Sequence, residues 1–469
     1  MIFKKVKSIK FEYLIILIAI LVSICWSNYN LNKFDNIKIN SNGKYYNQFL
    51  YADLNATWKT ADKFRKNLKE GNTFLNSIPE YEKFLLPSII VGSYYYLIDK
   101  DIYEKKENDQ IAIKEKNFKI GLMILQILIY FTSLIFFSKE LKEIVNKNLH
   151  KCIIIFLAAE PSLLQWHSSL WNESIFISLM LILFTLILKK SDKVLINFFI
   201  GIVLGLIFMQ RAIGFLYIIP VIFYLFLVNE KKIKSYFFLF VGYLVIILFV
   251  GLNNFKKTDH FYFLSIGHQY NSYYHYFAAD ILANKKKISN KDAKEILKNE
   301  EDKWITQNNI NLNLTKDISK NIKYRNKIFL RETFNNPIYV SKKFIKRVVV
   351  MCIIHPLWVN QHFYFDKHSP AAKKNPKEYF NKNLYKNIPY SLLIYIFVAV
   401  GIINYIKKLI INKKMDKFDK FLLFNTLSIL YFILISGMWG NPKYFTPCMI
   451  SLSFFFSVGF IELKKKYFK

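Results

Sequence analysis

The sequence predicts an all-α, polytopic membrane protein with about ten transmembrane helices, interfacial helices in its first outer loop and a second, large outer loop. Of the 469 residues, 53% are hydrophobic, yet the formal net charge is +33. The two properties are separated along the chain, because long apolar blocks alternate with stretches rich in Lys and Asn. A soluble domain would instead repeat its apolar residues at helical or strand period, and a disordered chain would contain far fewer of them.

Ten apolar segments are the predicted membrane spans. They cover residues 11–27, 119–138, 152–168, 174–188, 195–210, 213–228, 235–252, 389–405, 421–437 and 444–462. No small-residue cleavage site follows the first segment, so we interpret it as an uncleaved anchor. The four cysteines are far apart and lie in or beside apolar segments, which indicates lipid-buried thiols rather than a disulfide framework or a metal site.

The lysines orient these spans through the positive-inside rule. With a cytoplasmic N-terminus, the short inner loops contain sixteen lysines, whereas the short outer loops contain only Arg211 and Lys443. Counting the apolar stretch 84–98 as a further span would invert this asymmetry for most of the chain. We therefore expect it, and the similar stretch 345–358, to form interfacial or re-entrant helices on the outer side.

The expected organisation has three parts. Residues 1–252 form an N-terminal transmembrane module with a first outer loop at 28–118, residues 253–388 a large extracytoplasmic loop, and residues 389–469 the C-terminal transmembrane helices. Helical patterns at Asn290–Trp304 and Lys316–Phe334 indicate that the large loop is structured. We expect a multi-pass protein of the plasma (inner) membrane with both termini in the cytoplasm.

The positive charge has causes other than nucleic acid. Sixteen lysines orient the spans, and the joint abundance of Lys, Asn and Ile is typical of an AT-rich genome. Membrane lipids are therefore expected partners, and nucleic acid is not. Only five basic residues are Arg. Arg211 is one of them, which indicates a contact that Lys cannot make, such as a bidentate one with phosphate or carboxylate.

Ionisable residues at membrane depth are costly and are therefore candidate functional groups. Glu160, Glu173 and Arg211 are the main ones, all predicted on the outer side. Each has a structural alternative. Glu173 can serve as the N-terminal carboxylate of a helix, Glu160 before Pro161 can mark a kink, and Arg211 can extend along the apolar surface to the interface.

The order of several motifs carries a resemblance. The first span is followed by Asp53, Trp58 and Ala61 in a predicted amphipathic helix, then by an interfacial segment with Pro79 and Pro87. Later motifs are Glu160-Pro-Ser-Leu-Leu-Gln-Trp-His-Ser-Ser-Leu-Trp-Asn-Glu-Ser, Phe208-Met-Gln-Arg and Gly440-Asn-Pro-Lys-Tyr. This order resembles the GT-C superfamily of membrane glycosyltransferases, in particular bacterial enzymes related to protein mannosyltransferases and lipid A aminoarabinose transferases. Lys443 stands where that family usually carries Arg.

The resemblance implies an enzyme that moves a sugar from a polyprenyl-phosphate donor to a glycolipid, glycan or protein acceptor at the outer face. Asp53 would be the catalytic base, with Glu173 a second catalytic carboxylate that orients hydroxyl groups. Cations would hold the departing lipid phosphate. The substrate-binding candidates are Arg211, Lys443, Tyr444, His268 and Glu160, and Glu160 and a further residue, Asp62, are the weaker ones. The first loop has no Asp-x-Asp pair, so no cofactor is certain and a divalent cation stays open.

Other function classes stay open as alternatives. A lipid-linked glycan polymerase or ligase would be expected to use several arginines as phosphate clamps, and this chain has few. A polytopic transporter or flippase should show inverted repeats and polar residues at mid-membrane. No repeat is visible, and the polar candidates lie near the outer ends of the spans. A structural or sensor protein would have no need of Asp53 or Glu173.

Overall fold

The computed structural model of the chain describes most of its residues, and these are almost entirely helical. The described residues are 11–35, 53–80, 85–98, 103–106, 110–113, 116–168, 172–189, 194–228, 233–263, 273–353, 376–411, 414–438 and 442–467. Among them, one antiparallel hairpin pairs β1 (Tyr103–Lys106) with β2 (Gln110–Ile113). The all-α prediction is therefore confirmed apart from this hairpin, whose four-residue strands are too short for a period-two pattern to stand out.

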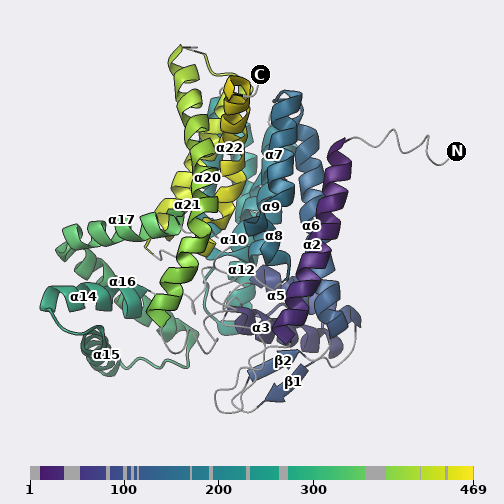
Figure 1. Cartoon of the computed structure of the whole chain (residues 1–469). Coiled ribbons are helices and arrows are strands. Elements are labelled where there is room, and N and C mark those ends of the chain that lie inside the picture. The colour runs from purple at the N-terminus through teal and green to yellow at the C-terminus, as the bar shows by residue number, and fades with distance from the viewer. Residues whose placement is uncertain are drawn as a thin grey trace.

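A bundle of long helices forms the body of the protein (Figure 1). Its helices are α2 (Phe11–Asp35), α6 (Lys116–Leu141), α7 (Lys147–Ala159), α9 (Asn172–Leu188), α10 (Val194–Gln210), α11 (Ile218–Val228), α12 (Ile233–Thr258), α20 (Pro376–Ile411), α21 (Lys417–Ser436) and α22 (Thr446–Tyr467). Helix α2 begins and α22 ends at the same end of the bundle, hereafter the terminal end. The hairpin and the short helices that follow α2 lie at the opposite end, hereafter the loop end.

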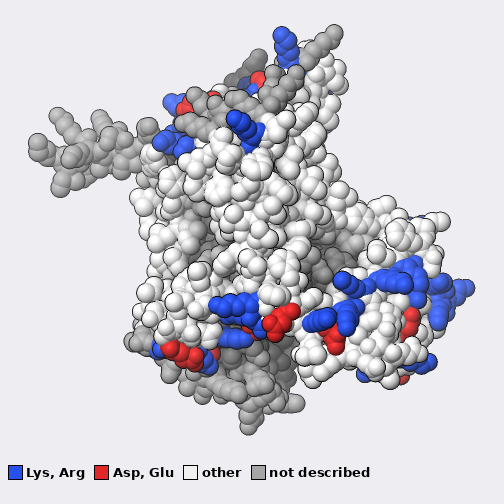
Figure 2. Space-filling model, turned by 180° about the vertical axis from the view of Figure 1, so that it is seen from behind, with Lys and Arg blue, Asp and Glu red and all other residues white. Residues whose placement is uncertain are grey.

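Several helices are suited to cross a membrane. Five segments are long and apolar enough, namely Ile120–Leu141, Ile233–Thr258, Ile388–Ile411, Lys417–Ser436 and Thr446–Tyr467. Five shorter apolar helices accompany them, namely Tyr13–Asn28, Leu85–Ile98, Glu173–Leu188, Val194–Gln210 and Ala212–Val228. In Figure 2 an uncharged belt separates charged side chains at the two ends of the molecule. These features indicate a multi-pass membrane protein, while the number of about ten spans stays a prediction.

The segment 152–168, predicted as one span, is broken in the structure. Helix α7 ends at Ala159, and the chain continues as α8 (Pro161–Leu164) and the 3-10 turn η2 (Gln165–Ser168). Pro161 has no N–H and disfavours the helical conformation for the residue before it. Glu160 adopts extended backbone, and its carboxylate accepts a hydrogen bond from the Ser162 N–H at 3.0 Å. The kink considered at Glu160 is therefore confirmed.

Glycines allow two helix pairs to pack closely. A Cβ added at Gly201 of α10 would lie 2.1 Å from the carbonyl oxygen of Leu239 on α12. At the crossing of α20 and α22, a Cβ at Gly401 would lie 2.0 Å from the Phe455 carbonyl oxygen, and one at Gly459 would lie 1.9 Å from that of Phe397. Small residues at such crossings are typical of helices that associate in a bilayer, where close backbone approach supplies much of the attraction.

The segment 28–118, predicted as the first outer loop and called by that name below, contains three helices in its described part. They are α3 (Asp53–Lys69), α4 (Phe74–Ser77) and α5 (Leu85–Ile98). Helix α3 confirms the predicted amphipathic helix. It crosses α5 where a Cβ at Gly92 would lie 2.7 Å from the Ala61 carbonyl oxygen. The stretch 84–98 is thus helical from Leu85, and its position at the membrane surface stays a prediction.

The large loop forms a helical unit with its own core beside the bundle (Figure 1). It consists of the π-helical turn η4 (Tyr273–Ala278), α14 (Ala279–Lys286), α15 (Asn290–Gln307), α16 (Thr315–Asn335) and α17 (Pro337–Ile353). Helices α15 and α16 confirm the two helical patterns predicted there. Helix α17 lies across the bundle direction and exposes Ile338 and Ile345. It covers the first part of the predicted interfacial stretch 345–358, and residues 354–358 lie outside the described part.

Candidate functional site

Three of the predicted site residues meet in the structure. Glu173 is in the first turn of α9, Arg211 directly follows the last residue of α10, and Tyr444 lies in the 3-10 turn η6 (Pro442–Phe445). Arg211 Nη1 forms an ion pair with Glu173 Oε1, and the guanidinium carbon lies 5.0 Å from the centre of the Tyr444 ring. Sequence positions separated by more than 200 residues thus form one cluster, which we call the Arg211 cluster.

Local backbone structure places Arg211. Its φ of −153° and ψ of 131° are extended, and they separate α10 from the 3-10 turn η3 (Ala212–Tyr217). The Arg211 carbonyl oxygen accepts a hydrogen bond from the Gly214 N–H at 2.8 Å, which starts that turn. Glu173 is a carboxylate at the N-terminal end of α9, where the helix dipole favours negative charge. The helix-terminal role and the contact with Arg211 therefore coexist.

Both charges of the Arg211 cluster are buried. Glu173 is 3% exposed and Arg211 is 5% exposed. Two unpaired charges buried in the protein would be very costly in free energy. A carboxylate and a guanidinium in contact offset most of that cost. Aromatic rings complete the surroundings, since the Phe176 ring centre is 6.0 Å from the guanidinium carbon. The arrangement holds the guanidinium in one orientation between an acid and two rings.

Further buried polar groups adjoin the Arg211 cluster. His167 Nδ1 is 2.8 Å from the hydroxyl oxygen of Ser174, the residue after Glu173, and Gln126 Nε2 donates to the His167 carbonyl oxygen at 3.5 Å. A small cavity of about 20 Å³ lies where α5, α6, α9 and α10 meet, and Gln126 and Gln210 line it. Such a volume admits about one water molecule. Ser174 was not among the predicted site residues, because a serine inside an apolar segment gives no distinctive signal.

Three predicted site residues lie partly or wholly outside the described part. Asp53 is the first residue of α3, and Lys443 precedes Tyr444 in η6, but both side chains lie outside the described part. His268 lies outside it altogether. The catalytic base assignment and two of the phosphate-binding assignments therefore stay predictions.

Glu160 contacts a different part of the bundle and lies nearer its middle than the outer side predicted for it, because the 13 residues of α7 lead to it from the terminal end. Its Oε2 accepts a hydrogen bond from the Tyr390 hydroxyl of α20 at 2.8 Å, while Oε1 accepts from the Ser162 N–H. It is 3% exposed and lines a groove between α7, α20 and α22. Its contacts therefore connect the end of α7 to α20 and cap the start of α8.

Asp62, the other weaker candidate, belongs to a charge cluster on α3. Its carboxylate lies 2.9 Å from Lys66 Nζ and 3.8 Å from Arg65 Nη1. The Arg65 guanidinium carbon is 3.9 Å from the centre of the Tyr95 ring on α5. These contacts contribute to the packing of α3 on α5 and give Asp62 a structural role.

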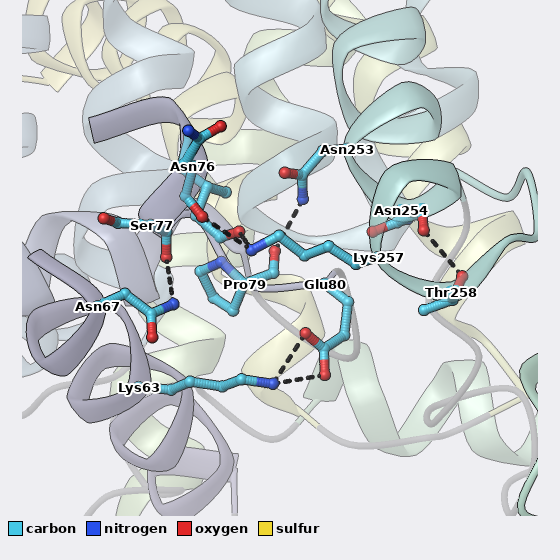
Figure 3. Close-up of polar contacts among 11 residues, drawn as sticks. Lys63, Asn67, Asn76, Ser77, Pro79, Glu80, Asn253, Asn254, Lys257 and Thr258 are labelled. Atoms are coloured by element: carbon cyan, nitrogen blue, oxygen red, sulfur yellow. Dashed lines mark hydrogen bonds and ion pairs between the residues drawn. The ribbon is translucent and has the colours of Figure 1, made fainter. Parts of the chain in front are cut away.

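A polar network attaches the first outer loop to the loop end of α12 (Figure 3). Asn253 Nδ2 donates to the Pro79 carbonyl oxygen at 2.9 Å, and Lys257 Nζ donates to the carbonyl oxygens of Asn76, at 3.2 Å, and Ile78. On the other side of the segment 76–80, Lys63 Nζ lies 2.8 and 2.9 Å from the two carboxylate oxygens of Glu80.

The ion pair with Lys63 also sets the protonation of Glu80. Burial tends to raise the pKa of this carboxyl group, but the hydrogen bonds and the charge of Lys63 outweigh it and hold the pKa below its ordinary value. Glu80 is therefore ionised at neutral pH. The segment 74–80 is thus held from both sides, by α3 and by α12.

Within the described residues, no group of three or more His, Cys, Asp or Glu side chains could hold a metal ion. No protein-family model matches the chain, and no curated protein matches it. The assignment of a function therefore depends on the residues of this chain.

Proposed function

We propose that this protein is a membrane glycosyltransferase that moves a sugar from a polyprenyl-phosphate donor to an acceptor at the outer face of the plasma membrane. The observation that carries the proposal is the convergence of Glu173, Arg211 and Tyr444 in the Arg211 cluster. A second support is the order of sequence motifs, which resembles that of GT-C enzymes. The uncharged belt between the charged ends of the molecule, which apolar helices form, would keep a prenyl tail in lipid while its sugar phosphate reaches the loop end.

The reaction needs a base and a cation. Asp53 takes the proton of the acceptor hydroxyl as that oxygen attacks the anomeric carbon. The bond between the anomeric carbon and the phosphate oxygen breaks, and the lipid phosphate leaves with the bonding electrons. Arg211 stabilises the negative charge that develops on the leaving phosphate.

The contact with Glu173 is compatible with this role of Arg211. A guanidinium has five N–H donors, so one can remain on Glu173 while others approach a phosphate oxygen. Glu173 and the Tyr444 ring then fix the orientation of the guanidinium before the donor arrives, which lowers the cost of ordering it in the transition state. In this proposal Glu173 positions Arg211, and it no longer needs to bind acceptor hydroxyl groups as first expected.

The test is sugar transfer in liposomes that contain the purified protein and a panel of polyprenyl-phosphate sugars. Wild type should transfer at least one sugar, and Asp53→Asn should lose transfer while it keeps the elution profile of the folded protein. Asp292→Asn, an exposed acid in the large loop, is the matched control and should transfer normally. Equal transfer by wild type and Asp53→Asn would remove the base assignment. Movement of the lipid-linked sugar across the bilayer without transfer would favour the flippase alternative.

A further inference from the structure

A long apolar groove runs along the outside of the bundle, away from the Arg211 cluster. It has a volume of about 710 Å³ and lies between α7, α20 and α22. Apolar side chains of all three helices line most of it, among them Ile155, Leu393 and Phe460. These three are 40%, 52% and 40% exposed, so the groove faces outward to the surroundings of the bundle.

The two ends of the groove carry opposite charge. Lys151, Lys464 and Lys465 line it at the terminal end, where α7 begins and α22 ends (Figure 1). Glu160 and the hydroxyl of Tyr390 line it at the other end. Lys465 also pairs with Glu462 at 3.0 Å, so it contributes less than a full charge to the groove.

The length of the groove matches one leaflet of a membrane. Residues 148–160 of the α7 segment line it, which corresponds to about 18 Å at the rise of an α-helix. Half of a typical hydrocarbon core is about 15 Å thick. One acyl chain that starts at the terminal end can therefore follow the groove to the depth of Glu160.

We propose that this groove binds an anionic phospholipid of the leaflet at the terminal end, with its headgroup phosphate beside Lys464 and Lys465 and one acyl chain along Ile155 and Phe460. The charges at the two ends of the groove determine which way the lipid lies in it. A lipid that entered with its phosphate at the other end would place that anion next to the Glu160 carboxylate and away from the lysines. The polyprenyl-phosphate donor of the proposed reaction would have that unfavourable orientation, because its phosphate belongs at the loop end. Lipid binding in this groove does not depend on the proposed transfer activity.

Lipid preference can be measured by native mass spectrometry of the purified protein in detergent with equimolar phosphatidylglycerol and phosphatidylcholine of identical acyl chains. Wild type should retain phosphatidylglycerol preferentially. A lysine near an anionic headgroup contributes roughly fivefold in affinity, and two free lysines would contribute roughly 25-fold. Because Lys465 also pairs with Glu462, Lys464→Ala with Lys465→Ala should reduce the preference by about tenfold. Ile155→Trp fills the groove and should reduce retention of both lipids.

The matched control is Lys139→Ala with Lys142→Ala, which removes two exposed lysines at the terminal end of α6, outside the groove. This control should keep the preference of wild type. Equal retention of the two lipids by wild type, or an equal loss in the control, would overturn the proposal. Displacement of phosphatidylglycerol by undecaprenyl phosphate at equal concentration would also overturn it and assign the groove to a prenyl tail. Lys464 and Lys465 are exposed, as are Lys139 and Lys142, so their substitution leaves the helix packing intact.

Discussion

Separating Arg211 from Glu173 should cost the protein more stability than any surface substitution. Arg211→Met leaves the Glu173 carboxylate buried without its cation, and Glu173→Leu leaves the guanidinium buried without its anion. Removing one member of a buried pair typically costs about 3–5 kcal/mol. The double variant removes both charges and should lie within about 1 kcal/mol of wild type, because apolar residues of similar volume often replace buried pairs without loss.

The charge-conserving variant Arg211→Lys separates the contributions of charge and shape. It keeps a cation for Glu173 but loses the planar group that faces Tyr444 at 5.0 Å. A cation over an aromatic ring contributes about 0.5–2 kcal/mol, so this variant should lose about 1 kcal/mol. The free energy of unfolding can be followed by SDS titration in mixed micelles. Single variants that each lose less than 1 kcal/mol would refute the view that the two charges depend on one another.

A second buried pair provides the control for activity. Arg325 Nε donates to Glu301 Oε1 at 2.6 Å in the large loop, and the two residues are 5% and 3% exposed. The same set of single and double variants there should change stability in the same way. Sugar transfer per folded molecule should survive the double variant at Arg325 and Glu301 but not the one at Arg211 and Glu173. Full transfer by both double variants would limit Arg211 to a structural role.

Three further predictions concern other regions. The lowered pKa of Glu80 means that its pair with Lys63 stabilises the first outer loop above about pH 4.5 and is lost as the pH falls further. Hydrogen exchange of residues 74–80, corrected for its intrinsic pH dependence, should therefore accelerate at acid pH in wild type but not in Glu80→Gln. Gly459→Val places side-chain atoms against a carbonyl of α20 and should cost about 3 kcal/mol or more, measured by the same SDS titration. A membrane-impermeant maleimide should label Glu300→Cys and Lys139→Cys from opposite sides of the membrane, and labelling from one side would refute the expected orientation of the large loop.

The helices were more predictable than their irregular junctions. Long apolar blocks identify membrane helices because the bilayer requires a fixed length of apolar chain, and the described helices follow them closely. The break after Ala159 was considered because Pro161 has a strong local effect. The break at Arg211 was predicted between the spans 195–210 and 213–228, but the extended backbone and the 3-10 turn that follow were not, since no proline or glycine directly follows Arg211 and its conformation depends on contacts between helices.

The site was predictable in its residue types and less so in its groupings. Scarcity of charge at membrane depth singled out Glu173 and Arg211 as candidates, but it said nothing of their contact across 38 positions. Glu160 has the same scarcity, yet it lies in the wall of a groove that three separate helices form. Such assignments depend on helix packing, which a single sequence does not specify at the level of individual side chains.

The five arginines show what their scarcity means in a chain that otherwise uses lysine. Four of them place the guanidinium carbon 3.9–5.2 Å from the centre of an aromatic ring. These four are Arg65, Arg211, Arg325 and Arg347. The fifth, Arg331, donates to two carboxylates, those of Glu300 and Glu332. Lysine can do neither as well, because it lacks a planar face and a fixed fork of donors. A rare arginine in this protein therefore marks a demand for guanidinium geometry, which is structural at most positions. Arg65 also combines a buried ion pair, an aromatic contact and a place at the loop end, but its ion-pair partner Asp62 lies on the same helix. Arg211 differs in that its partners Glu173 and Tyr444 come from distant parts of the chain, and that convergence favours a role in binding phosphate.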